Sequence, residues 1–143
     1  MRVAVFVKAN ADSEAGKMPS PELFRAMTDF NEELVKAGVM TMGEGLTPSV
    51  RGKRVRFDSK RRSTVIDGPF SETKELVAGL WIWQVASMDE ALAWIKRAPF
   101  EDSEIELRPI FGPEDFAGAV PPDVIERENK LRATAAAQDA KKS

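Results

Sequence analysis

Two helical segments, each enclosed by apolar strand segments, constrain the fold of this chain more than any other feature of its sequence. The first begins at Ser20, a capping residue followed by proline, and ends at Gly38, a residue type favoured at helix C-termini. The second runs from about residue 88 to 98, and Ser87 with Glu90 has the spacing of a capping box. With strands before and after each helix, the chain is predicted to build two β-α-β halves.

Strands are predicted around these helices, and residues 9–19 are interpreted as a polar loop. The apolar or alternating stretches that predict the strands are residues 2–8, 39–46, 53–58, 63–67, 78–86 and 104–110. The third and fourth form a hairpin between the two halves, with DSKRR as its turn. This order predicts an α+β fold, a ferredoxin-like sandwich with both helices on one face of an antiparallel sheet.

The face of the sheet opposite the helices then needs a cover, and we expect a second copy of the chain to supply it. The apolar residues expected on that face are Trp81, Trp83, Val65 and Phe57. A homodimer is therefore the predicted assembly.

The predicted α+β domain covers residues 1–112, and residues 113–143 form a C-terminal extension of different character. The whole chain has 143 residues, a length typical of one domain with its own core. The extension is first rich in Gly and Pro and then charged, which predicts a helix from about residue 122. Because its last residues lack an apolar stripe, we expect the end of this helix to fray.

The side-chain inventory excludes several classes of chemistry. The chain has no Cys, His or Tyr. A disulfide framework, a thiol nucleophile and a Cys-based metal site are excluded, and the usual general base near neutral pH is missing. No Asp/Glu spacing resembles a calcium loop, and the GEG stretch lacks the Gly-Lys-Ser/Thr continuation of a phosphate loop. We therefore expect no metal and no cofactor, and acid–base chemistry would fall to Asp, Glu or Lys.

Charge and hydropathy give an expectation about location and partners. The first apolar run, from Val3 to Val7, is too short for a signal peptide or a membrane span, so we expect a cytoplasmic protein with no membrane contact. The net charge of −2 points to no polyanionic partner. Residues 51–62 carry seven Lys or Arg against one Asp. Because such runs usually form solvated strand edges, we expect no specific nucleic-acid binding.

The stretch DGPFSETKE, which begins at Asp67, links two predicted strands with more chemistry than a turn needs. Gly68 relaxes the backbone, Pro69 fixes φ, and Asp67 can accept hydrogen bonds from the N–H groups just beyond it. In a functional alternative, Asp67 stands at the rim of a cleft as a carboxylate base, and Phe70 is an apolar wall that raises its pKa. Lys74 would then bind an anionic group.

Three further side chains are candidates for substrate binding. Glu44 lies between two glycines, which let a ligand approach closely or else form a bulge in an edge strand. Arg108 offers a planar fork to a ligand carboxylate or, as a structural ion pair, to Glu44 or Asp67. Trp83 shares strand parity with Trp81, so both belong either to a dimer core or to the aromatic wall of a pocket.

Several longer motifs resemble a known family. The stretches GEGLTPS, DGPFSETKE, VAGLWIWQV, MDEALAWI, IELRPIFGPEDF and VPPDVIERENKLR occur in the order found in YCII-related, DGPF-type bacterial proteins. The resemblance covers about residues 2–132 and implies a dimeric α+β barrel, built by two ferredoxin-like protomers packed sheet to sheet. It also implies kinship with a superfamily whose enzymes include a dehydrochlorinase acting on an aromatic ring. Some relatives are encoded beside sigma factors or fused to them.

The better-known branch of that superfamily uses a His–Asp pair, and this sequence has no His to supply it. From the residues and the resemblance together, we expect a small-molecule cleft in each protomer. Its expected lining is Glu44, Asp67, Lys74, Trp83 and Arg108. An enzyme of this kind would be an isomerase or lyase that transfers a proton on a small organic acid or ring compound. Asp67 would be the base, and Lys74 or Arg108 would stabilise negative charge. The alternative is a non-catalytic binding or regulatory partner associated with a sigma factor.

Overall fold

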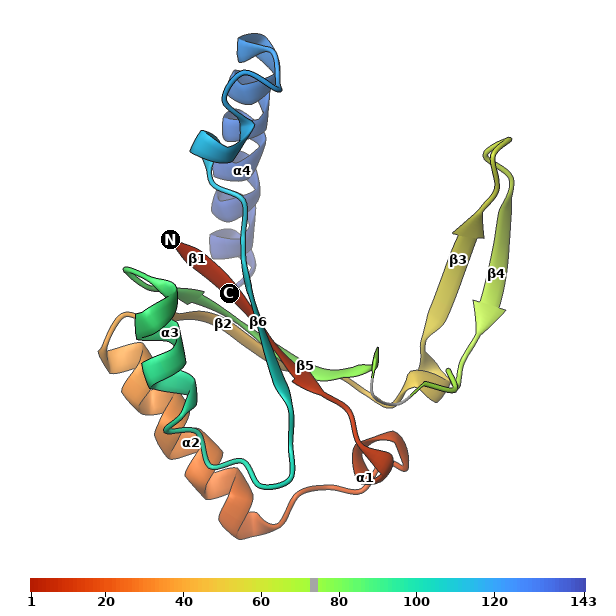
Figure 1. Ribbon diagram of the computed structural model, residues 1–143, viewed down its shortest axis with the longest axis vertical. Helices are drawn as coiled ribbons and strands as arrows, with labels where there is room; N and C mark the ends of the chain where they lie inside the picture. The colour runs from red at the N-terminus through yellow and green to blue at the C-terminus, as the bar shows by residue number, and fades with distance from the viewer. Residues whose placement is uncertain (73–74) are drawn as a thin grey trace. The chain divides into compact units, whose positions relative to one another are not determined.

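The structure, a computed structural model, describes residues 1–72 and 75–143. The chain divides into two compact units, Met1–Ile110 and Phe111–Ser143. In chain order, the described elements of the first unit are β1 (Arg2–Lys8), α1 (Ala11–Glu14), α2 (Pro21–Lys36), β2 (Met40–Gly45), the 3-10 turn η1 (Ser49–Arg51), β3 (Lys53–Phe57), β4 (Ser63–Asp67), β5 (Val77–Gln84), α3 (Met88–Ile95) and β6 (Ile105–Pro109) (Figure 1). Those of the second unit are the 3-10 turn η3 (Pro113–Phe116) and α4 (Pro122–Lys142).

A four-stranded sheet organises the first unit. Its strands lie in the order β2-β5-β1-β6, and each neighbouring pair is antiparallel. Helices α2 and α3 lie together on one side of this sheet (Figure 1). The hairpin of β3 and β4 forms a separate two-stranded sheet. The predicted α+β class with an antiparallel sheet is confirmed, and the strand order, with the hairpin set aside, is that of a split β-α-β arrangement.

The core lies between the sheet and the two helices. Trp81 and Trp83 of β5 both meet the ring of Phe30 from α2 edge-on, with ring centroids 6.1 and 6.5 Å apart. Our expectation that these two tryptophans lie on the face opposite the helices is therefore wrong. Gly43 of β2 makes room for this packing, because a Cβ atom there would lie 2.6 Å from Cδ1 of Trp81.

The other face of the four-stranded sheet is also apolar, but through different residues. Side chains alternate along a strand, so the neighbours of the core residues point to this face. Ala4 of β1 is paired with Ile82 of β5, and Phe6 with Leu80. Phe6, Leu80 and Ile82 are half-buried. We call these four residues the open face.

Val65 and Phe57 do not belong to that face, contrary to our expectation. Both lie on the β3–β4 hairpin, which pairs with no strand of the larger sheet among the described residues. Their side chains are exposed. The physical reason is that the two strands of the hairpin form their backbone hydrogen bonds with each other and are joined to the sheet only through connecting segments.

Residues 9–19, expected to be a loop, contain the short helix α1. Asn10 caps it by accepting a hydrogen bond from the Ser13 N–H at 2.9 Å, while the Ser13 hydroxyl oxygen accepts one from the Asn10 N–H at 2.9 Å. This reciprocal pair is a capping box with Ser in place of the usual Glu or Gln. The helix ends at Glu14, whose carboxylate contacts the turn η1.

In the second unit, the helix predicted from about residue 122 is confirmed as α4, which begins at Pro122. The rings of Phe111 and Phe116, ahead of this helix, are in contact with their centroids 5.2 Å apart and their planes tilted by 48°. None of the helices in the described parts of the chain has both the length and the apolar character that crossing a membrane requires.

Candidate functional site

The DGPF segment is anchored to the turn η1. The N–H of Phe70 donates to the Ser49 hydroxyl oxygen at 3.0 Å, and the N–H of Gly68 donates to the Gly52 carbonyl oxygen at 3.0 Å. The peptide bond between Gly68 and Pro69 is cis. A Cβ atom on Gly68 would lie 1.7 Å from the Ser49 carbonyl oxygen, so only glycine fits at this position.

Helix α1 clamps the same turn from another direction. The Glu14 carboxylate accepts the Ser49 N–H at 3.0 Å and the Ser49 hydroxyl at 2.5 Å. The guanidinium carbon of Arg54 lies 3.9 Å from the centroid of the Phe70 ring. Phe70, expected to be an apolar wall beside Asp67, instead stacks on a cation. We call Glu14, Ser49 and Phe70 the junction, because they tie three segments of the chain together.

Asp67 lies outside any desolvated cleft that the described residues form. Its carboxylate pairs with the Lys53 ammonium at 2.5 Å, and the two side chains are 74% and 67% exposed. The register of the hairpin sets Asp67 opposite Lys53, which explains this pairing. The expected crowded position of Asp67 is therefore wrong, and the expected position of Lys74 lies outside the described residues.

Glu44 and Arg108 lie on opposite edge strands of the sheet, β2 and β6. Three strand spacings separate them, about 14 Å, so they do not form a pair. Arg108 instead meets Glu106, with Nη1 3.4 Å from the carboxylate oxygen, which corrects its expected pairing with Glu44 or Asp67. Both Glu44 and Arg108 are exposed.

Trp83 cannot line a cleft in this chain, because its side chain is fully buried in the core. Its indole N–H has no hydrogen-bond partner among the described residues, whereas that of Trp81 donates to Asn31 at 3.0 Å. Trp83 is thus a packing residue. The sequence-predicted site residues that the structure describes are not brought together.

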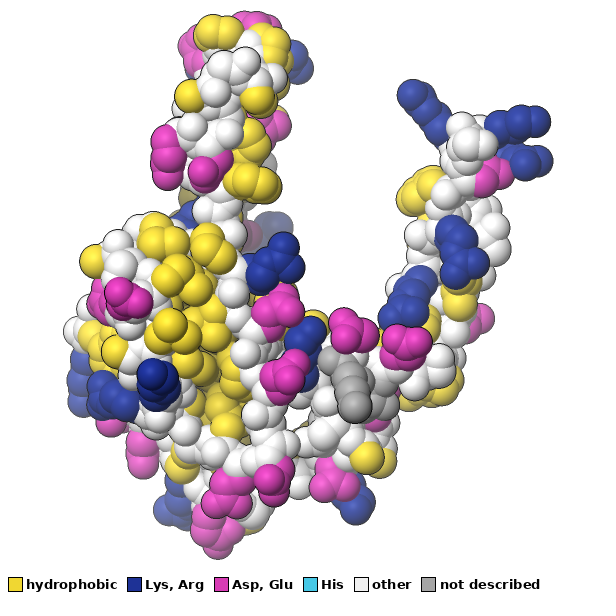
Figure 2. All heavy atoms as spheres, viewed as in Figure 1, with side chains coloured by type: hydrophobic (Ala, Val, Ile, Leu, Met, Phe, Trp, Pro, Cys, Tyr) yellow, Lys and Arg dark blue, Asp and Glu magenta, His cyan; other side chains and the backbone are white. Residues whose placement is uncertain are grey.

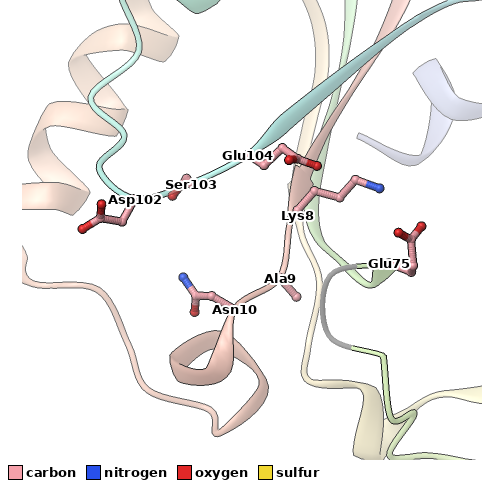
Figure 3. Close-up of a pocket in the computed structure, with 7 residues that line it drawn as sticks. All are labelled: Lys8, Ala9, Asn10, Glu75, Asp102, Ser103 and Glu104. Atoms are coloured by element: carbon pink, nitrogen blue, oxygen red, sulfur yellow. The ribbon is translucent and has the colours of Figure 1, made fainter.

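A pocket of about 620 Å³ lies where β1 ends and β6 begins (Figure 3). It is lined by Lys8, Ala9, Asn10, Glu75, Asp102, Ser103 and Glu104. Its volume is in the range of small-molecule sites. Asp102 has φ of 47°, a conformation uncommon outside glycine, and strained residues of this kind concentrate at functional sites. Glu75 is the last residue of the DGPFSETKE stretch, so that motif contributes to the pocket wall.

Lys8 is the distinctive residue of this pocket. Its side chain is only 13% exposed, yet its ammonium lies 3.7 Å from the nearest carboxylate oxygen, that of Glu106. This distance is longer than a hydrogen bond, and the ammonium makes none with the described residues. Figure 3 shows the Lys8 side chain on the same side of the pocket as the carboxylates of Glu75 and Glu104, with Asp102 on the other side.

Lys8 is not among the predicted site residues, because in the sequence it is only the last residue of the first predicted strand. A signal for it existed, since Lys8 is a charged residue at the end of an apolar strand. Asp102, Ser103 and Glu104 were missed because nothing in a polar loop indicates which pocket it borders.

Comparison with known proteins identifies the family. A model of the YCII-related domain matches residues 1–114. An uncharacterized protein of Rhizobium meliloti (strain 1021) is 30% identical over 97 residues, which cover 66% of this chain and 77% of that protein. Among solved structures, 5-chloro-2-hydroxyhydroquinone dehydrochlorinase from Burkholderia phenoliruptrix AC1100, in complex with 2,5-dihydroxybenzoquinone, is similar with a TM-score of 0.39 and 18% identity. That similarity covers 80% of this chain and 98% of the other. The family match confirms the resemblance carried by the motifs, and the chain belongs to the YCII-related family.

Proposed function

We propose that this protein binds a small polar compound in the pocket at the end of β1, with Lys8 as its principal contact. The observation that supports the proposal is Lys8, whose side chain is only 13% exposed and whose ammonium has the Glu106 carboxylate at 3.7 Å but no hydrogen bond within the described residues. A buried cation is stabilised by partners. An acceptor oxygen on a ligand would supply one.

The charges around Lys8 define the class of ligand. Glu75, Asp102 and Glu104 bring three carboxylates to the pocket against one ammonium. Carboxylates accept hydrogen bonds and repel anions. The favoured ligand is therefore a neutral or cationic compound with hydroxyl or amine donors and one acceptor oxygen that faces Lys8. This narrows the expected small organic acid or ring compound towards a ring compound or polyol.

For a reaction, we propose proton transfer of the isomerase or lyase type. Glu104 is the proposed base, because its backbone is held against Lys8 by an N–H···O=C bond of 3.1 Å. The Lys8 ammonium would stabilise the negative charge that develops on the ligand oxygen. Glu104 takes the role expected of Asp67, whose carboxylate is exposed and paired with Lys53.

A ligand screen tests the pocket. Small hydroxylated and amine compounds are screened by ligand-observed NMR, with dicarboxylates as a contrasting set. We expect binding by the first set to be lost in Lys8→Met. It should be retained in Lys17→Met, which removes a lysine that is 70% exposed. Equal binding by wild type and Lys8→Met would contradict the proposal, and Glu104→Gln separates binding from turnover for any compound that reacts.

We also propose that the chain forms a homodimer through the open face, as the family resemblance implied. Phe6, Leu80 and Ile82 support this, because they form an apolar surface outside the core cluster. Exposed apolar patches of this kind mark association surfaces. Mass measurement in solution at micromolar concentration tests it, and a stable monomer would count against the dimeric barrel.

The alternative function is binding to a protein partner such as a sigma factor. The observation that favours it is an apolar patch: Figure 2 shows hydrophobic side chains gathered over the region between α3 and β6. Ile95 of α3, Leu107 of β6 and Phe100 from the segment between them are partly buried hydrophobic residues. Titration of a purified sigma factor with wild type and with Phe100→Ser tests this role, and equal responses would contradict it. Because the Phe100 ring also contacts Trp81, the unfolding midpoint of the variant is measured alongside to establish that it is folded.

A further inference from the structure

The β3–β4 hairpin, residues 53–67, has an exposed apolar strip on one of its faces. Val55 and Val65 lie opposite each other in the register, and Phe57, two positions further along β3, lies on the same face. Their side chains are 52%, 60% and 69% exposed, respectively. We call the hairpin the arm, and Val55, Phe57 and Val65 its apolar strip.

Neither face of the arm is covered by other described residues well enough to make it a stable sheet. Its two strands pair with each other, and most of their side chains are exposed. A two-stranded hairpin alone in water is marginally stable, and it needs a third strand or a packing surface. A surface that covered the apolar strip would stabilise the arm.

The charge of the arm differs in sign from that of the rest of the chain. Its cations are Lys53, Arg54, Arg56, Lys60, Arg61 and Arg62, and its carboxylates are Asp58 and Asp67. The arm therefore carries +4, and because the whole chain carries −2, the remainder carries −6. Figure 2 shows Lys and Arg side chains along the arm and at its tip.

We propose that the arm docks on a second copy of this chain, with the apolar strip against the acidic body of its partner. Opposite charge attracts the two surfaces, and burial of the strip provides the affinity. The inference extends the homodimer proposed above and rests on it. It adds an interface that the open face does not provide.

A second copy fits the arm better than a nucleic acid does. Phosphates would leave the apolar strip uncovered, since they offer charge without an apolar surface. Several cations of the arm are also engaged: Lys53 pairs with Asp67, Arg62 pairs with Asp58, and Arg54 stacks on Phe70.

The dissociation constant of the dimer tests the proposal, measured by sedimentation equilibrium on the full chain at low and high salt. One variant replaces the apolar strip by threonine (Val55→Thr, Phe57→Thr, Val65→Thr), which keeps strand propensity. A second, Arg56→Glu, reverses one charge. The matched control is Val35→Thr, the same change at a residue of α2 that is 57% exposed.

We expect the strip variant and Arg56→Glu each to raise the dissociation constant about tenfold or more, as loss of a central interface contact does. Salt should weaken the wild-type dimer, and Val35→Thr should leave it unchanged. In wild type, amide hydrogen exchange in the arm should slow at concentrations above the dimer midpoint. That measurement needs no variant.

Three outcomes would overturn the proposal. If the dissociation constant of the dimer is unchanged in both arm variants, the arm has no role in the dimer, and the proposed open-face interface is unaffected. A protein that is monomeric at every concentration would contradict both proposed interfaces, that of the arm and that of the open face. A short DNA duplex that binds through Arg56 and slows exchange in the arm, where dimerisation does not, would assign the arm to nucleic acid.

Discussion

Gly68 lets the DGPF segment pack closely on the turn η1, because it has no side chain. A Cβ atom there would meet the Ser49 carbonyl oxygen at 1.7 Å, and this backbone atom is itself fixed in the turn η1. Gly45, in contrast, has nothing within 4 Å of its Cβ position. The two glycines are therefore a matched pair, one required by sterics and one free.

We predict that Gly68→Ala lowers the free energy of unfolding by about 3 kcal/mol or more, because the clash forces the backbone to move. Gly45→Ala should change it by less than about 1 kcal/mol and in the stabilising direction, since alanine restricts the unfolded chain. Urea denaturation followed by tryptophan fluorescence measures both. Equal values for the two variants would mean that the DGPF segment is not packed on η1.

Asp67 is predicted to matter little for stability. Exposed ion pairs contribute about 0–1 kcal/mol, and the Asp67–Lys53 pair is mostly exposed on both sides. Asp67→Asn should therefore shift the unfolding midpoint by no more than a few degrees, as should Lys53→Met. A large fall in Tm for Asp67→Asn, with no ligand present, would indicate a charge network that this exposed pair does not explain.

At the residue scale, the sequence could predict the type of chemistry but not the neighbours of each side chain. The pattern around Asp67 predicts a link between two strands, and in the structure β4 ends at Asp67 and β5 begins at Val77. The pattern cannot indicate that Lys53, fourteen residues earlier, will face Asp67, because that depends on the register of the hairpin to which both residues belong. The alternation of side chains along a strand likewise indicates that Trp81 and Trp83 share a face. Which face that is depends on where α2 packs, and the sequence does not show this.

At the element scale, the turn of the β3–β4 hairpin is organised by Asp58. Its carboxylate accepts the Arg62 N–H at 3.0 Å, the Arg62 guanidinium at 2.7 Å and the Lys60 N–H at 2.8 Å. The backbone N–H of Arg62, then its side chain, and then the Lys60 N–H hold the pKa of Asp58 below its usual 3.8. These bonds favour the ionised form.

A lowered pKa makes the turn sensitive to acid in one direction. The folded-state pKa of Asp58 is below the unfolded value. The ionised Asp58 carboxylate therefore contributes to the stability of the fold above pH 3.8, and this contribution is lost as pH falls through the folded pKa. NMR titration of the carboxyl carbon should give a pKa below 3.8 in wild type. Arg62→Ala should return it part of the way, because the backbone N–H remains, and Arg56→Ala should leave it unchanged. A wild-type pKa at or above 3.8 would contradict this turn geometry.

In the junction of Glu14, Ser49 and Phe70, the Ser49 hydroxyl bonds to both of the other residues and so links three segments of the chain. Ser49→Ala leaves the Phe70 N–H and one Glu14 oxygen without their partner. We expect a loss of about 1–3 kcal/mol in the free energy of unfolding, the cost of unsatisfied polar groups that are partly buried. In a double-mutant cycle with Glu14→Ala, the two losses should not add. Additive losses would show that α1 and η1 are energetically independent.

Elements were more predictable than the contacts between them. Caps and apolar spacing mark α2 and α3 directly, since Ser20 and Ser87 each accept a hydrogen bond from the first turn. Helix α1 was not predicted, because its capping box has Ser13 at the position where Glu or Gln is usual. The pocket could not be predicted from the sequence, because Lys8, Glu75 and Asp102 come from separate segments that meet only in the folded protein.

At the scale of the whole molecule, the division of the chain separates the core from the C-terminal extension. The aromatic cluster of Phe30, Trp81, Trp83 and Phe100 lies within the unit Met1–Ile110. The end of that unit is fastened by the Ile110 N–H, which donates to the Arg2 carbonyl oxygen at 2.9 Å. The residues that match the family, 1–114, include this whole unit.

We therefore predict that a chain ending at residue 112, the expected domain boundary, folds without α4. It should unfold cooperatively and keep the near-UV circular dichroism of its buried tryptophans, because the ring contacts that produce this signal lie within Met1–Ile110. The matched control ends at residue 104 and lacks β6, whose five residues from Ile105 to Pro109 pair with β1. That chain should lose the near-UV signal while keeping secondary structure, as loosely packed states do. If the chain ending at 112 behaves like the one ending at 104, the second unit takes part in holding the core, and the domain boundary proposed from the sequence is wrong.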